Sequence, residues 1–183
     1  AAGLFPARPG IAVDLCCGSG ALGLALAASP SVELAELHSV DVDLAAVACA
    51  RRNAAALGGE GRDYQVYLGD LYEPLPGSLR GRVDVLLANV PYVPTDEVPL
   101  LPAEARLHEA EVALDGGADG LDVLRRVADG APQWLVPGGH LLIEISQRQV
   151  PTAEAAFASA GLRPRIVSSE ELGATVVIGG LPA

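Results

Sequence analysis

Short β-rich runs alternate with Ala- and Leu-rich helical stretches along this chain, and this alternation restricts its fold more than any other feature. A strand followed by a helix and a further strand places the two strands parallel in one sheet, with the helix on its face. The predicted strands are Ile11–Leu15, Leu37–Val42, Gln65–Leu68, Val83–Ala88, Leu141–Ile145, Arg165–Val167 and Thr175–Ile178. The predicted helices are Ala21–Ala28, Asp43–Leu57, Asp119–Trp134 and Ala153–Ala160. We therefore expect an α/β protein with a mostly parallel seven-stranded sheet, helices on both faces and an antiparallel strand near the C-terminus.

The ends of the predicted elements carry recognisable signals. Asp43 is predicted to cap the N-terminus of the second helix, and Gly58-Gly59 to end it. The segment Pro91–Pro102 holds four prolines without periodicity, which predicts an irregular loop directly after the strand Val83–Ala88. Parallel sheets of this kind bind their ligands outside the carboxyl ends of the strands. The residues that follow the strands are therefore the first candidates for a functional site.

A glycine-rich loop follows the first predicted strand. Gly18-Ser19-Gly20-Ala21-Leu22-Gly23 matches the pattern G-x-G-x-x-G, which nucleotide-binding enzymes of several classes share. Asp14 lies four residues before Gly18, and a carboxylate there favours the cationic ammonium of a methionine over a pyrophosphate. These residues favour S-adenosylmethionine (SAM) over a nicotinamide or flavin nucleotide.

Acidic residues at the next two strand ends support the same cofactor. Asp41 lies at the end of the second strand, where a carboxylate can accept both ribose hydroxyls. Asp70 follows the third strand and can accept a hydrogen bond from an adenine amino group. The predicted cofactor site therefore comprises the carboxylates and glycines, their neighbours in sequence and the amide after the fourth strand: Asp14, Cys16, Gly18, Gly20, Asp41, Val42, Asp70, Leu71 and Asn89.

Asn89-Val90-Pro91-Tyr92 follows the fourth predicted strand and forms a candidate acceptor site. The Asn89 side-chain oxygen and the Val90 carbonyl can accept the two hydrogens of a planar NH2 group, and Tyr92 can stack on it. Together with a SAM site, these four residues predict transfer of a methyl group to an amide or amino nitrogen. We expect them to be the catalytic residues.

These motifs resemble the class I SAM-dependent methyltransferases, and more narrowly the protein-(glutamine-N5) methyltransferases that modify the Gly-Gly-Gln motif of peptide release factors. The resemblance extends over most of the chain. Besides the two sites above, it rests on Ala50–Ala54, Gly69–Leu75, His108-Glu109, Ala113–Asp122, Pro137-Gly138-Gly139 and Glu144–Gln149. The stretch Ala113–Asp122 is the most specific of these, because few other methyltransferases carry it.

The resemblance implies a Rossmann-like class I methyltransferase fold and a single catalytic domain over residues 1–183. It also implies methyl transfer from SAM to a protein glutamine, with a release factor as a candidate partner. The chain departs from the family pattern in three ways. Val90 stands where the family has Pro, Ala110 replaces another Pro, and the family's N-terminal helical domain is absent.

Composition bears on the alternatives. The net charge is −11 and all twelve basic residues are Arg, which disfavours nucleic acid as a partner. Two alternatives remain open: methylation of an exocyclic amine of adenine or guanine, and a SAM-binding module without catalysis. No apolar run reaches the length of a membrane span, and the His residues lack the spacing of metal ligands. The three Cys residues form no CxxC pair and cannot all form internal disulfides, which indicates a reducing, cytoplasmic setting. His108-Glu109 could line the mouth of the acceptor site, and Glu144 could support it.

Overall fold

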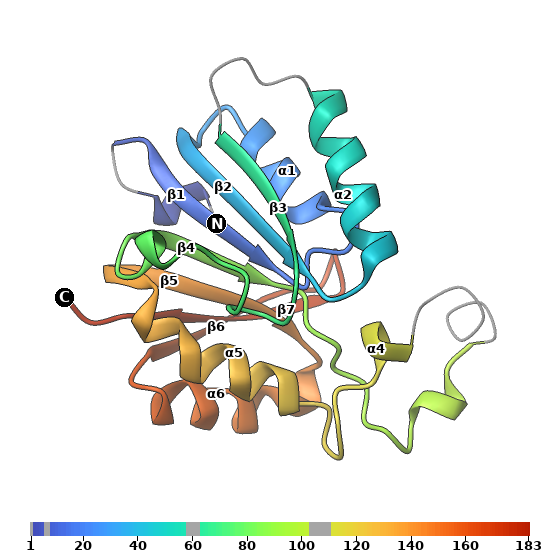
Figure 1. Ribbon diagram of the computed structural model, residues 1–183. Coiled ribbons are helices and arrows are strands. Elements are labelled where there is room, and N and C mark those ends of the chain that lie inside the picture. Colours follow the sequence, from blue (N-terminus) through green and yellow to red (C-terminus); the bar gives the residue numbers. More distant parts are fainter. Residues whose placement is uncertain (1, 6–7, 58–62, 103–110) are drawn as a thin grey trace.

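The computed structural model describes residues 2–5, 8–57, 63–102 and 111–183. Its centre is a seven-stranded sheet with the order β3-β2-β1-β4-β5-β7-β6 (Figure 1). The strands are β1 (Gly10–Leu15), β2 (Leu34–Asp41), β3 (Asp63–Leu68), β4 (Val83–Ala88), β5 (Leu135–Ile145), β6 (Arg163–Ser169) and β7 (Ala174–Gly180). Strands β1 to β5 pair in parallel, whereas β7 is antiparallel to both β5 and β6. The predicted sheet, including its antiparallel C-terminal strand, is therefore confirmed.

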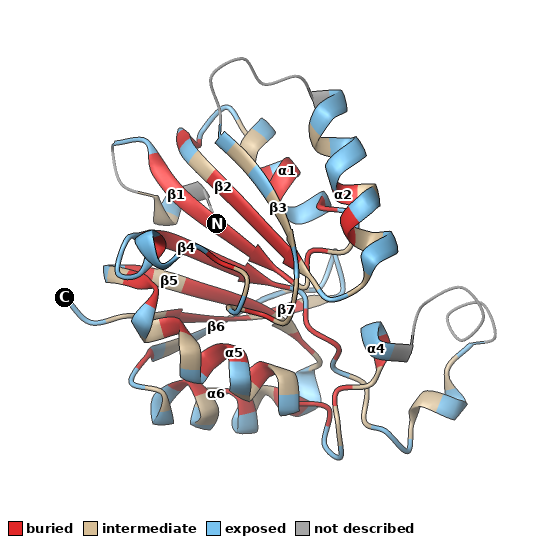
Figure 2. Cartoon of the chain, viewed as in Figure 1, coloured by how far each residue is buried: buried red, intermediate tan, exposed pale blue. Residues whose placement is uncertain are grey.

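Helices cover both faces of the sheet. They are α1 (Ala21–Ala28), α2 (Leu44–Leu57), α4 (Glu111–Leu114), α5 (Asp122–Gly130) and α6 (Val150–Ser159). One buried cluster joins Val13 of β1 to α5 and α6, and a second joins Ala12 of the same strand to Leu26 of α1. Because successive side chains of a strand point to opposite faces, β1 supplies both clusters. Figure 2 shows the central strands as the most buried part of the protein.

Several predicted boundaries agree with the structure. Helix α1 and strand β4 have the predicted limits, and the Ala45 backbone N–H donates to the Asp43 carboxylate (2.9 Å), as expected of an N-cap. The predicted stop at Gly58-Gly59 and the pair His108-Glu109 lie outside the described residues.

Other predicted boundaries differ from the structure by a few residues, and two elements show the differences that have a clear physical cause. The helix predicted to run from Asp119 to Trp134 is limited to α5, and a 3-10 turn (Ala131–Gln133) follows it. Pro132 has no backbone N–H to continue the α-helical pattern. Strand β5 begins at Leu135, six residues before the predicted Leu141, because its ladder with β4 continues through a register shift. Gly138 adopts a left-handed φ of 80° in this irregular part, which explains how Pro137-Gly138-Gly139 is accommodated in a strand.

The register of the parallel strands brings their carboxyl ends to one edge of the sheet. Leu15 pairs with Val40 on one side and with Ala88 on the other, Asp41 pairs with Leu68, and Ala88 pairs with Ile143. The segments that leave β1, β2, β3, β4 and β5 therefore emerge side by side. Among the described residues, no helix is both long and apolar enough to cross a membrane.

Candidate cofactor and acceptor site

The glycine loop leaves the end of β1 and turns sharply into α1. Cys16, Gly18 and Gly20 have positive φ values of 52°, 54° and 79°. The loop is tied to β2, because the Cys17 N–H donates to the Val40 carbonyl (3.0 Å) and the Gly18 N–H donates to the Asp41 carboxylate (2.8 Å). A Cβ atom on Gly20 would lie 3.0 Å from the Tyr64 hydroxyl, so both the backbone conformation and the packing favour glycine here.

Asp14 lies beneath this loop and is fully buried. One of its carboxylate oxygens, Oδ2, accepts a hydrogen bond from the Gly23 N–H (2.9 Å), while Oδ1 has no partner among the described residues. Burial, opposed by the Gly23 hydrogen bond and assisted by the charge of Asp41, raises the pKa of Asp14 to about 7. Asp14 thus connects the strand to the first turn of α1 and holds a proton that an exposed Asp would have released.

The acidic residues at the next two strand ends also make contacts within the protein. The second carboxylate oxygen of Asp41 accepts from the Asp43 N–H (2.9 Å). Asp70 forms an ion pair with Arg126 of α5 at 2.6 Å. Of their neighbours, Val42 is 55% exposed, whereas Leu71 is buried and has a positive φ of 48°.

The thiol of Cys16 shows that these groups surround one place. Burial, together with the carboxylates of Asp41, Asp14 and Asp70, raises the pKa of Cys16 to about 12, whereas Arg126 acts in the opposite direction. Three acidic groups from the ends of β1, β2 and β3 therefore converge on the glycine loop. A cationic ligand with hydroxyl and amino groups suits this set of acceptors. The space at Gly18 is also open, since a Cβ there would meet no atom within 4 Å. The residues present therefore fit SAM.

The segment Asn89–Tyr92, which we call the clamp, leaves β4 beside this loop. Ala88 pairs with Leu15, so Asn89 follows β4 at the level where Cys16 follows β1. Asn89 is exposed, Val90 is 2% exposed, Pro91 is buried and Tyr92 is 37% exposed. The clamp thus presents an amide and an aromatic ring outward, while its middle is anchored in the core.

The stretch Ala113–Asp122 lies against the backbone that continues from the clamp, and we call it the platform. Val93 donates to the Leu114 carbonyl (3.1 Å), and Gly116 donates back to Val93 (2.9 Å). A Cβ on Gly116 would lie 2.6 Å from the Pro91 carbonyl oxygen. This close packing explains why glycine occurs in this stretch and gives a structural role to the most specific motif of the sequence.

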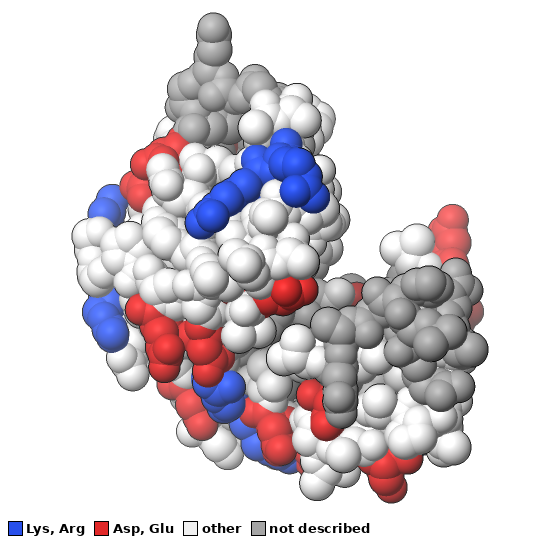
Figure 3. Space-filling view, turned by 45° about the vertical axis from the view of Figure 1, so that its right-hand side comes forward, with Lys and Arg blue, Asp and Glu red and all other residues white. Residues whose placement is uncertain are grey.

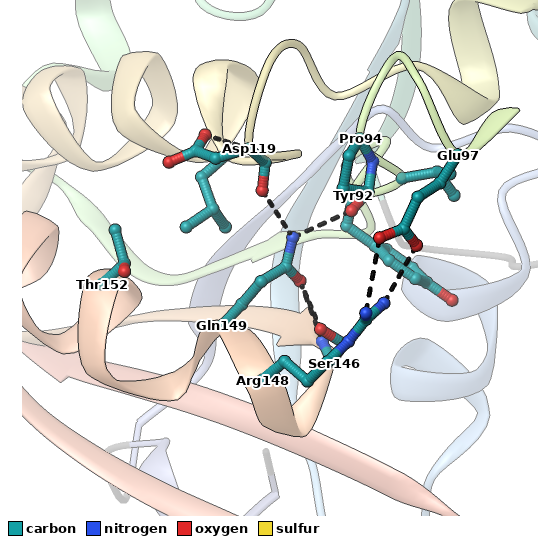
Figure 4. A pocket seen from close by; sticks show the side chains of 10 residues that line it. Tyr92, Pro94, Glu97, Asp119, Ser146, Arg148, Gln149 and Thr152 are labelled. Carbon is teal, nitrogen blue, oxygen red and sulfur yellow. Dashed lines mark hydrogen bonds and ion pairs between the residues drawn. The ribbon is translucent and has the colours of Figure 1, made fainter.

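Tyr92 lines two cavities. The first has a volume of about 340 Å³ and is bordered by Glu97, Asp119, Arg148 and Gln149 (Figure 4). The second, of about 430 Å³, is bordered by Glu144 and Thr175. In the space-filling view the surface is hollowed between the sheet and the segment that follows β4, and acidic side chains border the hollow (Figure 3).

Three contacts at the site were not predicted from the sequence. Asn53 of α2 donates to the Ser19 carbonyl of the glycine loop (2.9 Å), Arg126 pairs with Asp70, and Gln149 donates to the Tyr92 carbonyl (2.9 Å). Asn53 and Gln149 lie in stretches that carry the family resemblance, which was the only available signal for them. Among the described residues, no group of three or more His, Cys, Asp and Glu could hold a metal ion.

The chain was compared with known families and curated proteins. The family described as methyltransferase small domain matches residues 4–119. A release factor glutamine methyltransferase of Geobacter sulfurreducens is 34% identical over 92% of this chain and 56% of its own length. A ribosomal protein uL3 glutamine methyltransferase of Burkholderia pseudomallei is 42% identical over 83% of this chain and 49% of its own length. The chain thus spans about half the length of the curated relatives it matches.

A similar fold occurs among solved structures. A T. thermophilus 16S rRNA methyltransferase, solved with AdoMet and guanosine, has a TM-score of 0.63 and 22% identity, covering 95% of this chain and 38% of that chain. At this identity the likeness establishes the fold alone. Together, these matches confirm the resemblance that the motifs indicated. The chain belongs to the methyltransferase small domain family and has the Rossmann-like fold of class I methyltransferases.

Proposed function

We propose that this protein transfers a methyl group from SAM to the side-chain amide nitrogen of a protein glutamine. The observation that carries the proposal is the position of the clamp, which follows β4 directly beside the glycine loop of β1. The family and the names of the similar curated proteins support it. A release factor and ribosomal protein uL3 are the two candidate partners, since those names differ in the protein modified.

The cofactor is assigned to the carboxyl edge of the sheet. We infer that Asp41 accepts the ribose hydroxyls, Asp70 accepts from the adenine amino group, and the backbone at Gly18 and Gly20 lies along the methionine part. Asp14 lies beneath the glycine loop and acts through its hydrogen bond to the Gly23 N–H, and a bound cationic ligand would favour its ionised form. SAM, when bound, would supply a methyl group on a sulfonium sulfur; an amide nitrogen can attack this methyl carbon, with the sulfur as the leaving group.

The clamp addresses the weak nucleophilicity of an amide nitrogen, whose lone pair is delocalised into its carbonyl. The Asn89 side-chain oxygen and the Val90 carbonyl each accept one hydrogen of the glutamine NH2, which fixes the direction of the nitrogen. Tyr92 packs on the flat amide. Rate enhancement then comes from orientation and from acceptors that stabilise the positive charge developing on nitrogen, whose proton leaves to water.

The charges near the clamp favour a protein over a nucleic acid. The arginines of α5 and of the turn after β5 are all paired with carboxylates: Arg125 with Asp119, Arg126 with Asp70 and Arg148 with Glu97. A phosphate backbone would compete with these carboxylates for each guanidinium. With a net charge of −11, binding of a polyanion at this edge is disfavoured.

The proposal covers a single catalytic domain over residues 1–183, and a cytoplasmic location remains a prediction. A transfer assay with methyl-labelled SAM tests the activity, with a release-factor domain, protein uL3, a nucleic-acid pool or no acceptor. Label on a glutamine of either protein supports the proposal, whereas label on nucleic acid alone would contradict it.

The clamp is tested by Asn89→Ala. Loss of one positioned acceptor should lower kcat at saturating SAM about 100-fold to 1,000-fold, and calorimetry separates this loss from any change in the affinity for SAM, since Asn89 also belongs to the predicted cofactor site. Asn53→Ala is the matched comparison, because the chain has only these two asparagines. Asn53 contacts the glycine loop and not the clamp, so its substitution should act on the affinity for SAM. An Asn89→Ala variant that transfers methyl groups normally would rule out the clamp mechanism.

A further inference from the structure

Gln149 is a buried polar residue outside both predicted sites. It ends the 3-10 turn Gln147–Gln149 that follows β5, and its exposed fraction is 8%. Its side-chain Nε2 donates to the carbonyls of Tyr92 (2.9 Å) and Asp119 (3.2 Å). Its Oε1 accepts from the Ser146 N–H (3.1 Å) and from the Ser146 hydroxyl (2.9 Å). Both amide hydrogens and both oxygen lone pairs are thereby used.

These four hydrogen bonds join three separate segments. Tyr92 ends the clamp, Asp119 belongs to the platform and Ser146 follows β5, as Figure 4 shows. Gln149 is 57 residues from Tyr92 in sequence and 30 from Asp119. The amide therefore joins the end of the clamp and the platform to the turn that follows β5.

Gly120 shows how closely these segments fit. Its φ of 75° is left-handed, and a Cβ atom there would overlap the Tyr92 carbonyl oxygen and lie 2.6 Å from Gln149 Nε2. A side chain at position 120 could not be accommodated without separating the clamp from the platform. The Tyr92 carbonyl thus has one position, set by Gly120 on one side and by Gln149 on the other.

We propose that Gln149 is a positioning residue for methyl transfer, which rests on the proposed function of the clamp. By holding the Tyr92 carbonyl, it fixes the C-terminal end of the four-residue clamp, whose N-terminal end is fixed by β4. The Asn89 oxygen and the Val90 carbonyl then keep their directions without any contact between Gln149 and the reacting atoms. Loss of the two Nε2 bonds should lower kcat and leave the SAM site unchanged, because the glycine loop is held by other residues.

Gln149→Glu is the most informative variant. It keeps the acceptor that faces Ser146 but replaces the donor with an oxygen that repels the carbonyls of Tyr92 and Asp119. A displacement of the clamp by about 1 Å is expected to lower kcat about 100-fold. Gln147→Glu is the matched control, since Gln147 lies in the same turn and is exposed. Ser146→Ala is a milder variant that removes one bond to Oε1 and leaves both Nε2 bonds, so its kcat should fall much less.

Two further measurements separate a positioning role from a general structural one. Hydrogen exchange should become faster in Gln149→Glu at the Val93 and Gly116 amides, which bond the platform to the residue after the clamp. This measurement requires neither SAM nor an acceptor. The affinity for SAM should stay within about twofold of wild type. The inference is overturned if kcat and amide exchange match wild type, or if SAM affinity and global stability fall together with kcat.

Failure of the inference is distinguishable from failure of the proposed function. If wild type methylates a nucleobase and no glutamine, the proposed acceptor is wrong, yet the exchange measurement and the kcat for that acceptor still test Gln149. If wild type methylates glutamine and Gln149→Glu does so equally fast, only the inference is wrong.

Discussion

The buried carboxyl of Asp14 should make the stability of this protein fall as the pH rises. Its folded-state pKa, about 7, lies above its ordinary value of 3.8 because burial disfavours the charged form. Between these two pH values the folded protein keeps a proton that the unfolded chain has released. The resulting contribution to stability is therefore full below pH 3.8 and is lost as the pH rises through about 7.

The size of this effect follows from the two pKa values. Each pKa unit corresponds to about 1.4 kcal/mol, so the complete effect is about 4 kcal/mol, of which about 3 kcal/mol falls between about pH 5 and 8. Asp14→Asn removes the titration. Its amide oxygen can still accept from the Gly23 N–H, and its NH2 takes the place of the unpartnered Oδ1. The unpaired NH2 costs about 1–3 kcal/mol, but this cost does not change with pH.

Urea unfolding of both proteins over this pH range measures the effect. The free energy of unfolding of wild type minus that of Asp14→Asn should decrease by about 3 kcal/mol from about pH 5 to 8. Asp84→Asn is the control, because Asp84 is also buried but accepts from the Ile11 N–H (2.9 Å) and pairs with Arg8 (2.8 Å). Asp84→Asn should destabilise the protein. The free energy of unfolding of wild type minus that of Asp84→Asn should not show the same decrease with pH, because both proteins keep Asp14. A difference between wild type and Asp14→Asn that is independent of pH would refute the reasoning.

Two substitutions test other parts of the site. Asn53→Ala removes the exposed hydrogen bond to the Ser19 carbonyl, so the dissociation constant for SAM in calorimetry should rise about threefold to tenfold; an unchanged constant would show that the loop keeps its shape without Asn53. Val90→Pro keeps the carbonyl of the clamp and fixes φ at a buried position, so kcat in the transfer assay should equal or exceed that of wild type; a large loss of activity would show that the Val90 N–H is needed.

The sequence predicted those features that depend on local pattern. Strand β4 and helix α1 were located by continuous apolar runs and by the glycine and proline residues at their ends. The predicted strand missed the first six residues of β5, because Pro137 and Gly138 normally interrupt strands. In the structure, a left-handed Gly138 allows the ladder to continue. Boundaries of this kind depend on pairing with a neighbouring strand, which no local pattern contains.

Contacts between distant segments could not be predicted in this way. The pairs Arg126–Asp70 and Gln149–Tyr92 are separated by 56 and 57 residues. The sequence identified Asp70 and Tyr92 because each follows a strand, and strand ends of a parallel sheet meet at one edge. It gave no partner for either residue, since the direction of a side chain across that edge depends on how α5 and the turn after β5 pack.

In the proposed mechanism, the division between clamp and platform would let one chemistry serve different acceptors. An amide oxygen and a backbone carbonyl can accept the hydrogens of any planar NH2 group, whether it belongs to glutamine or to a base. What surrounds the clamp must then decide which group reaches it. Gly116 and Gly120 bring the platform against Pro91 and Tyr92, where larger residues would not fit. Substitution of Gly116 or Gly120 should therefore alter the choice of acceptor more than the presence of Val instead of Pro at position 90. Either residue at position 90 keeps the backbone carbonyl on which the clamp depends.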